Sequence, residues 1–590
     1  MAGHAVILWT VCAISGLRGL AAAALLGTAM SSAALGPSYT FLVDSEPGAA
    51  APLGQAAPRP VTRGGAAPAP RIEGFFNTRS EAVDLLLQPA FGTRTADWAS
   101  RYDPASIWAK PGYYAVTLTD LHVHVELTAT ERVALHRYTF PRPGKVQVLV
   151  QTDAAEVVVR GREVAGSNFL VRFDRDPIKA EPLPSQSGSK VLTFDLTNGN
   201  QLQARVAVSN SGIEGARLSM AQAQGRRFDA TARDANEQWA DVLGRIRIEG
   251  SERMRRDFYT ALYRVLSSAD GARTTWPLLS LVVPEKMDAR VQNLIDQHRV
   301  LGFLPTWGRA ANPALVAIAG AMAQGFHGFN ANEALAAMLT TATTDRPDAP
   351  PWGALDIHGY FPFDIVASGS VAKTLEAGIG DDAVARVARL AGTAGASARA
   401  DLASAFGQRA QGWRKLLDPE TLLMRERSSQ GQWGEAAQAA ATFIPAQHDP
   451  SGLVHALGGR GRFGAALDQA LLQAEPDEHL AWLYAWTDAP WKGHQHLRKS
   501  TSAFAALGFY PVVPASGRFV LGAPQVPRAD IHWPDGRVFR IRTQGFSPTR
   551  PYAQSVQLNG RALVGFELSY DEIRAGGELI FTMVPTPTGK

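Results

Sequence analysis

Cysteine is nearly absent from this 590-residue chain, which contains only Cys12. Cys12 lies in an apolar N-terminal segment, so removal of that segment would leave a mature protein without any thiol. Disulfide bonds and cysteine-based metal sites are then excluded.

Clustered charge is lacking as well. The chain has 58 Lys and Arg against 54 Asp and Glu, a formal net charge of +4, and these residues are scattered. Proteins that bind nucleic acid usually concentrate basic residues on one surface, so we expect no nucleic-acid partner. With 46% apolar and 19% charged residues, the composition is that of an ordinary globular protein. The length predicts more than one domain.

Residues 1–35 resemble a secretory signal peptide. One basic residue, Arg18, precedes an apolar run from Leu20 to Met30, and small residues follow at 31–34. We therefore expect a secreted or periplasmic protein. An uncleaved membrane anchor is the alternative, because the segment has enough apolar residues to span a bilayer. Unless the leader is uncleaved, we expect no stable membrane association.

Four further segments differ in pattern. Residues 36–70 are rich in Ala, Pro and Gly and predict a linker, with order beginning near Arg71. Residues 71–250 contain alternating stretches such as "YYAVTLTDLHVHVELTATERVALHRYTF" and predict an antiparallel β-sandwich. Residues 251–518 have apolar residues at helical spacing and predict a helical bundle or toroid. Residues 519–590 return to strand patterns, with "PDGR" and "LNGR" as hairpin signals. We expect this C-terminal β tail to cover the helices.

Eight short phrases carry a resemblance to a known family. They are "PGYYAVTL", "VELTATERVALHRYTFP", "FYTALYRV", "SVAKTLE", "DPETLLMR", "EPDEHLAWLY", "ALGFYPVVP" and "SVQLNGRAL". In this order they resemble phrases of glycoside hydrolase family 92, the calcium-dependent exo-α-mannosidases. The resemblance implies a β-sandwich followed by an (α/α)6-type barrel. It also implies inverting hydrolysis of terminal α-mannose in mannose-containing glycans, with calcium as cofactor.

The resemblance extends to part of the catalytic machinery. An inverting glycosidase uses a carboxylic acid and a carboxylate base about 6.5–9.5 Å apart. The family's acid phrase is matched by "QAEPDEHLAWLY", which identifies Glu475 as the general acid and His479 as a substrate contact. Without that context Glu475 would simply suit a helix N-terminus. The "HD" phrase survives at His448 and Asp449, which we predict to contact substrate.

Other site phrases are missing or altered. The family's base is an aspartate just upstream of "ALGFYPV", yet no Asp or Glu lies between Asp488 and Val513. The phrase with two family histidines reads "GFFNTRS", and a polar sugar-binding phrase reads "GEAAQAAATF". We therefore expect impaired catalysis and weak or no calcium binding, with ligands not identifiable. A non-catalytic glycan-binding or scaffold homologue and a damaged gene product are the alternatives.

Four other motifs have simpler interpretations. Gly459, Gly461 and Gly464 match a dinucleotide fingerprint, but in a helical region without a βαβ unit. The sequence His122-x-His124-x-Glu126 is more typical of a half-polar strand face than of a metal site. The pair His494 and His496 lies in a basic segment expected to be an exposed helix end. Asp381–Asp382, in "AGIGDDA", indicates a helix N-cap.

Overall fold

The structure is a computed structural model of the chain. It describes residues 39–44, 59–63, 71–76, 85–94, 97–152, 157–183, 188–209, 212–267, 273–306, 312–346, 351–366, 368–391, 396–434, 446–473 and 478–587.

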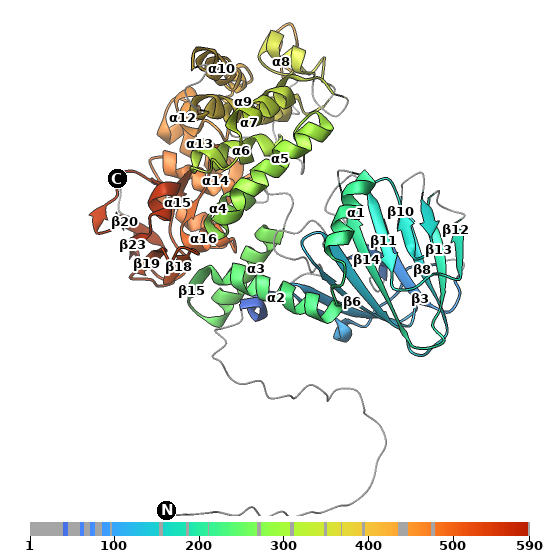
Figure 1. Ribbon diagram of the computed structural model, residues 1–590. Helices are drawn as coiled ribbons and strands as arrows, with labels where there is room; N and C mark the ends of the chain where they lie inside the picture. Colours follow the sequence, from blue (N-terminus) through green and yellow to red (C-terminus); the bar gives the residue numbers. More distant parts are fainter. Residues whose placement is uncertain are drawn as a thin grey trace, which may run out of the picture. The chain divides into compact units, whose positions relative to one another are not determined.

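An antiparallel β-sandwich forms the N-terminal part of the described chain, as predicted (Figure 1). One sheet has the order β1 (Arg59–Arg63), β2 (Arg71–Phe76), β3 (Leu85–Phe91), β8 (Lys145–Thr152), β13 (Lys190–Asp195), β12 (Lys179–Pro182). The other has the order β4 (Trp108–Lys110), β5 (Tyr113–Leu118), β6 (Val123–Ala129), β7 (Val133–Thr139), β14 (Gln201–Val208), β11 (Phe169–Phe173), β10 (Glu163–Ala165), β9 (Val158–Arg160). Side chains alternate between the two faces of each strand, and those that point between the two sheets form the core. In β6 these are Val123, Val125 and Leu127.

Order begins earlier than predicted, within the range 36–70. A short 3-10 helix, η1 (Tyr39–Leu42), precedes the strand β1, which pairs with β2. The backbone N–H of Asp44 donates to the hydroxyl of Thr260 at 2.9 Å. A strand ladder is made by backbone groups and needs no apolar side chains, so a composition poor in large apolar residues concealed it.

Two helices occupy the last part of the range predicted as sandwich. They are α1 (Gly212–Gln222) and α2 (Phe228–Gly244). Their apolar residues Met220 and Phe228 pack with Val133 and Leu135 of the second sheet, on the face turned away from the sandwich core. That second apolar cluster explains why the outer face of this antiparallel sheet is not fully polar.

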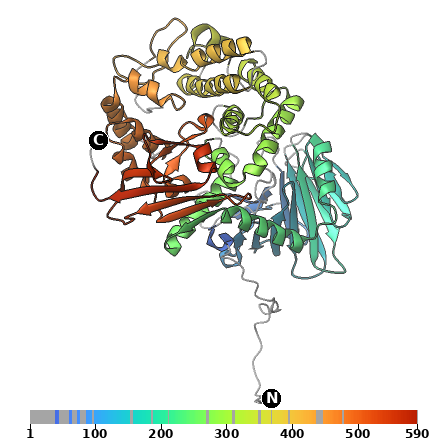
Figure 2. The same ribbon diagram turned by 60° about the vertical axis from the view of Figure 1, so that its left-hand side comes forward.

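Helices make up the middle of the chain, as predicted (Figure 2). They are α3 (Glu252–Ser267), α4 (Thr275–Val282), α5 (Met287–Leu301), α6 (Pro313–Ala323), α7 (Ala331–Thr343), α8 (Trp352–His358), α9 (Ser370–Leu390), α10 (Ala396–Arg409), α12 (Pro450–Ala456), α13 (Arg460–Gln473), α14 (Glu478–Trp482), α15 (Trp491–Leu497) and α16 (Ala503–Leu507). The longest, α9, packs against α6, α7 and α10. The predicted class, a β-sandwich followed by an (α/α)6-type helical domain and a β tail, is confirmed.

The prediction of an N-cap at Asp381–Asp382 is wrong, because both residues lie inside α9. The glycines before them suggested a helix break. A Cβ on Gly380 would lie 2.9 Å from Leu315 Cδ1, and one on Gly378 would lie 3.0 Å from His448 Cε1. These glycines therefore permit close packing of α9 against its neighbours rather than ending the helix.

The C-terminal strands pack against the helical domain. Strand β15 (Ile246–Glu249), before α3, starts a sheet of order β15-β18-β19-β23-β20-β21, with β18 (Arg528–His532), β19 (Val538–Gln544), β23 (Gly577–Val584), β20 (Tyr552–Leu558) and β21 (Arg561–Ala562). Trp533 donates through Nε1 to the carbonyl of Leu281 at 2.8 Å, and the Tyr570 hydroxyl donates to the carbonyl of Ser280 at 2.9 Å. The β tail thus covers the helices, as expected.

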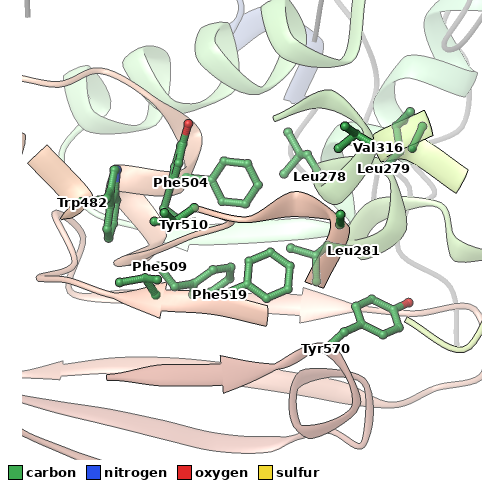
Figure 3. Packing of buried hydrophobic residues seen from close by; sticks show 14 of the residues in the cluster. Leu278, Leu279, Leu281, Val316, Trp482, Phe504, Phe509, Tyr510, Phe519 and Tyr570 are labelled. Atoms are coloured by element: carbon green, nitrogen blue, oxygen red, sulfur yellow. The ribbon is translucent and has the colours of Figure 1, made fainter. Parts of the chain in front are cut away.

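One apolar cluster joins these elements (Figure 3). Leu278 and Leu281 of α4 belong to it, as do Phe504 of α16 and Phe519 of β17 (Arg518–Leu521). Phe504 and Phe519 have ring centroids 6.3 Å apart. Burial of aromatic side chains of this size is a major source of stability.

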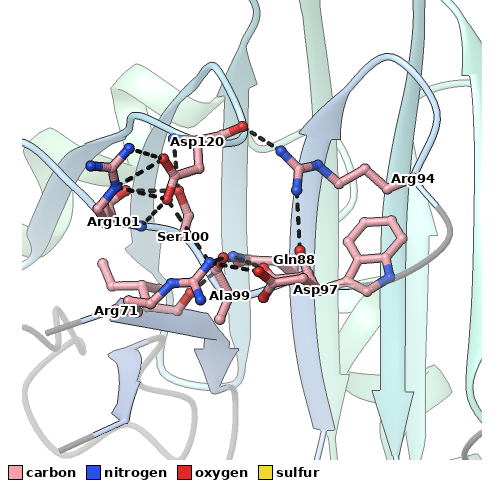
Figure 4. A network of polar contacts seen from close by, with 10 residues as sticks. Arg71, Gln88, Arg94, Asp97, Ala99, Ser100, Arg101 and Asp120 are labelled. Carbon is pink, nitrogen blue, oxygen red and sulfur yellow. Dashed lines mark hydrogen bonds and ion pairs between the residues drawn. The ribbon is translucent and has the colours of Figure 1, made fainter. Parts of the chain in front are cut away.

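A polar network fastens loops of the sandwich to its strands (Figure 4). Asp120 accepts from the guanidinium of Arg101 at 2.8 Å and from its backbone N–H at 2.8 Å. Arg71 reaches Asp97 at 2.9 Å. The buried Gln88 amide donates to the carbonyl of Trp98 at 2.9 Å. These contacts position the chain that precedes β4.

No helix of the described residues combines the length and the apolar character needed to cross a membrane.

Candidate functional site

The predicted general acid, Glu475, lies outside the described residues, so its role stays a prediction. The description resumes at Glu478, the first residue of α14. Glu478 Oε1 accepts from the Ser502 hydroxyl at 2.6 Å and from Trp482 Nε1 at 3.2 Å. Ser502 is the N-cap of α16. Glu478 therefore connects the start of α14 to the start of α16, a role that the sequence did not predict.

His479, a predicted substrate contact, is fully buried in α14. Its ring meets that of Tyr510 edge to face, with centroids 5.8 Å apart. Burial holds the pKa of His479 well below its usual value, and nearby Arg273 lowers it further. Tyr510 also stacks on Trp482 at 5.3 Å. His479 is thus a neutral side chain in an aromatic layer, and contact with substrate stays a prediction.

His448 and Asp449 both have contacts within the protein. His448 is 6% exposed and its Nε2 lies 2.8 Å from the carbonyl oxygen of Ala410. Burial lowers the pKa of His448. Asp449 is the N-cap of α12, accepts from the Gly452 N–H at 2.8 Å and pairs with Arg414 at 3.2 Å. These contacts connect the start of α12 to the chain after α10, and substrate contact by either residue stays a prediction.

The connection where the family's base would lie is short. Only residues 498–502 separate α15 from α16, and none of them is acidic. Two carboxylates upstream of this connection have partners. Asp468 accepts from the Tyr484 hydroxyl at 2.6 Å and from Lys492 at 2.6 Å, and Asp488 pairs with Arg460 at 3.4 Å.

Glu376 is a titratable group that sequence reasoning did not select. It ends the phrase "SVAKTLE", lies on α9 and is half-buried. Burial raises the pKa of its carboxyl, against the opposing effect of Lys373. Among the described residues it has no hydrogen-bond or ion-pair partner. A carboxyl with a raised pKa is a feature of general acids, so Glu376 is a further candidate.

The His122–Glu126 motif is not a metal site in this structure. Glu126 accepts from Arg137, which faces it across the strand pair β6–β7, and from the Tyr113 hydroxyl at 2.7 Å. His124 Nδ1 lies 3.0 Å from the Thr117 hydroxyl. The interpretation as a half-polar strand face is confirmed.

The other two motifs also take structural roles. Gly461 and Gly464 lie inside α13, which follows α12 rather than a strand, so no dinucleotide site is formed there. In α15, His496 is exposed and stacks on Tyr484 with centroids 5.7 Å apart. His494 is mostly buried, contrary to expectation, and burial lowers its pKa to about 4.

Calcium requires several oxygen ligands in one place. In the ranges that the structure describes, no three Asp, Glu, His or Cys side chains are grouped so as to hold a metal ion. The family's calcium therefore stays a prediction for this chain.

Comparisons with known proteins agree with the fold. The family model described as "Glycosyl hydrolase family 92 catalytic domain" matches residues 215–270, 266–504 and 498–585. The model described as "Glycosyl hydrolase family 92 N-terminal domain" matches residues 25–174. Among curated proteins there is no match.

Several solved structures share the fold over nearly the whole chain. A family GH92 α-mannosidase from Bacteroides thetaiotaomicron, solved with mannoimidazole, is 21% identical with a TM-score of 0.76; the match covers 93% of this chain and 95% of that one. An inverting GH92 mannosidase from Bacteroides thetaiotaomicron VPI-5482 is 22% identical with a TM-score of 0.73, covering 92% and 94%. A third GH92 hydrolase, ccman5, is 20% identical with a TM-score of 0.72, covering 93% and 98%.

Proposed function

The chain belongs to glycoside hydrolase family 92, and on that premise we propose that it recognises terminal α-mannose in glycans but hydrolyses it poorly. Family membership and the mannosidase folds it resembles support the substrate class. The signal-peptide-like leader supports action outside the cytoplasm, in a secreted or periplasmic setting.

One observation carries the proposal of weak hydrolysis, namely the five-residue connection between α15 and α16 without a carboxylate. The stretches matched by the catalytic-domain model overlap at 498–504 and at 266–270. Overlapping ends are what segments missing from this chain would produce. The overlap at 498–504 lies where the sequence lacks an aspartate resembling the family's base. An inverting cut needs a base to activate water, and no Asp or Glu lies between Asp488 and Val513, where that base is expected.

The acid half of the reaction would remain with Glu475. It would protonate the glycosidic oxygen as the bond to the leaving sugar breaks. When bound, calcium would hold sugar hydroxyls and favour distortion of the ring. Without a base, water must attack the anomeric carbon unaided, and turnover should fall by about 10²–10⁴-fold.

The proposal is tested with two substrates. We expect little or no cleavage of natural α-mannobiosides, and slow cleavage of an activated aryl α-mannoside whose leaving group needs little protonation. The variant Glu475→Gln should then reduce aryl-mannoside cleavage only slightly. Robust mannobioside cleavage, with inversion seen by proton NMR and abolished by Glu475→Gln, would contradict the proposal.

Two further variants identify any replacement group. Glu376→Gln tests the partly buried carboxyl of α9, and loss of cleavage there would assign Glu376 a role in the reaction. Glu478→Gln is the matched control, because its carboxylate is held by Ser502 and Trp482. If no variant and no wild-type protein cleaves anything, a rise in melting temperature with mannose still reports a sugar site.

Calcium binding is tested separately by calorimetric titration. Weak or no binding is expected, because affinity depends on the number of charged ligands. Stoichiometric binding at micromolar calcium would contradict this expectation and support a complete site.

A further inference from the structure

A polar cavity lies beside the sandwich, built by residues that the proposed function does not use. Its volume is about 210 Å³. It is formed by the turn between β6 and β7, the end of α1 and one face of α2. The polar lining side chains include Glu131 and Arg132 of the turn, Ser219 and Gln222 of α1, and Asp234 and Gln238 of α2.

Part of this lining is already engaged. The Thr130 hydroxyl accepts from the Val133 N–H at 3.0 Å and so holds the turn. Arg226 pairs with Asp234 at 2.8 Å, and Glu131 pairs with Lys286 at 3.0 Å. These two ion pairs are neutral overall, so they fix the walls of the cavity without giving it a net charge.

Thr231 donates to the carbonyl of Arg227, whereas four other polar side chains of the lining have no partner among the described residues. Arg132 presents a guanidinium without an ion pair, and Gln222 and Gln238 present side-chain amides. Ser219, almost fully buried, adds a hydroxyl. The cavity therefore offers one uncompensated positive charge and three neutral groups that both donate and accept hydrogen bonds.

From this set of groups we propose that the cavity binds a small hydroxylated carboxylate, namely a sugar acid. Arg132 would pair with the carboxylate in the bidentate geometry that guanidinium favours. Gln222, Gln238 and Ser219 would exchange hydrogen bonds with the hydroxyls. The cavity is far larger than the ~10–15 Å³ that one ordered water needs, and its size suits a single sugar unit. This inference does not depend on the proposed hydrolase function.

The ligand would come as a free sugar acid or as the terminal uronic acid of a glycan. Calorimetry on the full-length protein distinguishes these sources with D-glucuronate and methyl β-D-glucuronide. Glucose, which lacks the charge, and acetate, which lacks the hydroxyls, are the reference probes at the same ionic strength. We expect saturable binding of glucuronate at millimolar concentration and much weaker binding of both reference probes. Binding of the methyl glycoside equal to that of glucuronate would assign the site to glycan ends, and its loss would assign it to free acids.

Two variants locate the binding. Arg132→Met should weaken glucuronate binding about tenfold or more, because a hydrogen-bonded charge is lost. Gln222→Glu keeps the shape but adds a repelling carboxylate, and should weaken binding as well. The control is Arg253→Met, which removes an exposed arginine of α3 from outside the lining. Unchanged melting temperatures establish that the variants fold.

Four results would overturn the proposal. Three are no saturable binding of glucuronate, equal affinity for acetate, and equal binding by wild type and Arg132→Met. The fourth is equal weakening by Arg253→Met, because it would indicate general attraction of anions.

Discussion

The β-sandwich and the helical domain each contain an arginine that binds two carboxylates, one more enclosed and one exposed. In β7, Arg137 contacts Glu126, whose side chain is 13% exposed, at 2.6 Å; in α10, Arg409 contacts Asp381, whose side chain is 1% exposed, at 2.6 Å. The two arginines are similarly enclosed, with side chains 18% and 13% exposed. The arrangements are close enough to be compared group by group.

The buried acids nevertheless differ in protonation. Burial raises the pKa of Glu126, but hydrogen bonds from Arg137 and from the Tyr113 hydroxyl more than offset this and hold it below its usual value. Among the described residues Asp381 receives side-chain hydrogen bonds from Arg409 alone, and burial raises its pKa to about 6. Two differences therefore favour the ionised form of Glu126, namely the second donor beside the arginine and the less complete burial of the carboxyl.

The largest effect is expected for Arg409→Met. It leaves Asp381, whose side chain is 1% exposed, without a counter-charge, and should lower the free energy of unfolding by about 3–5 kcal/mol. Urea unfolding at neutral pH measures this. The control is Arg386→Met, which breaks the pair with Asp382 one turn away; these side chains are 29% and 17% exposed, so water can reach Asp382 and the cost should be smaller. Equal losses in the two variants would contradict the prediction.

Arg137→Met should cost less, about 2 kcal/mol, because Glu126 keeps the Tyr113 hydroxyl. The same urea titration measures the loss. A loss as large as that of Arg409→Met would show that the tyrosine does not stabilise the carboxylate.

Lowering the pH should separate the two variants further. The folded-state pKa of Asp381 lies above its unfolded value, so protonation favours the folded state as pH falls below about 6. Arg409 lowers the pKa of Asp381, so its removal raises that pKa further and the variant gains this stability at a higher pH than wild type. The deficit of Arg409→Met should therefore shrink as pH falls from 7 toward 6, by at most about 1.4 kcal/mol per pH unit. The deficit of Arg137→Met should change less, because the Tyr113 hydroxyl still lowers the pKa of Glu126.

Buried histidines also make the free energy of unfolding depend on pH. Burial lowers the pKa of His136 to about 3 and that of His494 to about 4. Since the unfolded chain takes up these protons first, stability falls as pH drops below about 6.5. The loss is common to wild type and variants, so the difference between their unfolding free energies is the quantity to compare.

Tyr113→Phe should convert the sandwich arrangement into one like that of the helical domain. Loss of the hydroxyl should cost about 1 kcal/mol and raise the pKa of Glu126. Combined with Arg137→Met, it should make the deficit depend on pH, as predicted for Arg409→Met. A combined deficit that does not change with pH would refute the role given to the second donor.

The exposed partners should matter least. Asp229 and Asp356 have side chains 67% and 58% exposed. Asp229→Asn and Asp356→Asn should each change the unfolding free energy by under ~1 kcal/mol, because exposed ion pairs are well hydrated and screened. A larger effect of either would mean that the buried acid depends on its exposed neighbour.

Periodicity was sufficient to predict the order of β-sandwich, helical domain and β tail. Features that depend on contacts with distant parts of the chain could not be predicted from periodicity. Gly378 and Gly380 leave room for His448 and Leu315 to pack closely against α9, and the sequence pattern alone does not show this packing. Strand β15 was assigned to the sandwich because four residues cannot reveal a partner far along the chain. Glu475 was predicted only from its resemblance to a family phrase, and its role stays a prediction because it lies outside the described residues.

The pairing of β15 with β18 has a consequence for biosynthesis. Strand β15 (Ile246–Glu249) pairs with β18 (Arg528–His532), which is far along the chain. During synthesis β15 therefore has no strand partner until most of the chain has left the ribosome. The long loop between the two strands must close before they can pair, and the entropy lost on closure opposes this pairing. The backbone groups at the edge of β15 therefore stay unpaired until the C-terminal strands have been synthesised. A chain that stops before them would leave β15 unpaired and prone to pair with other molecules.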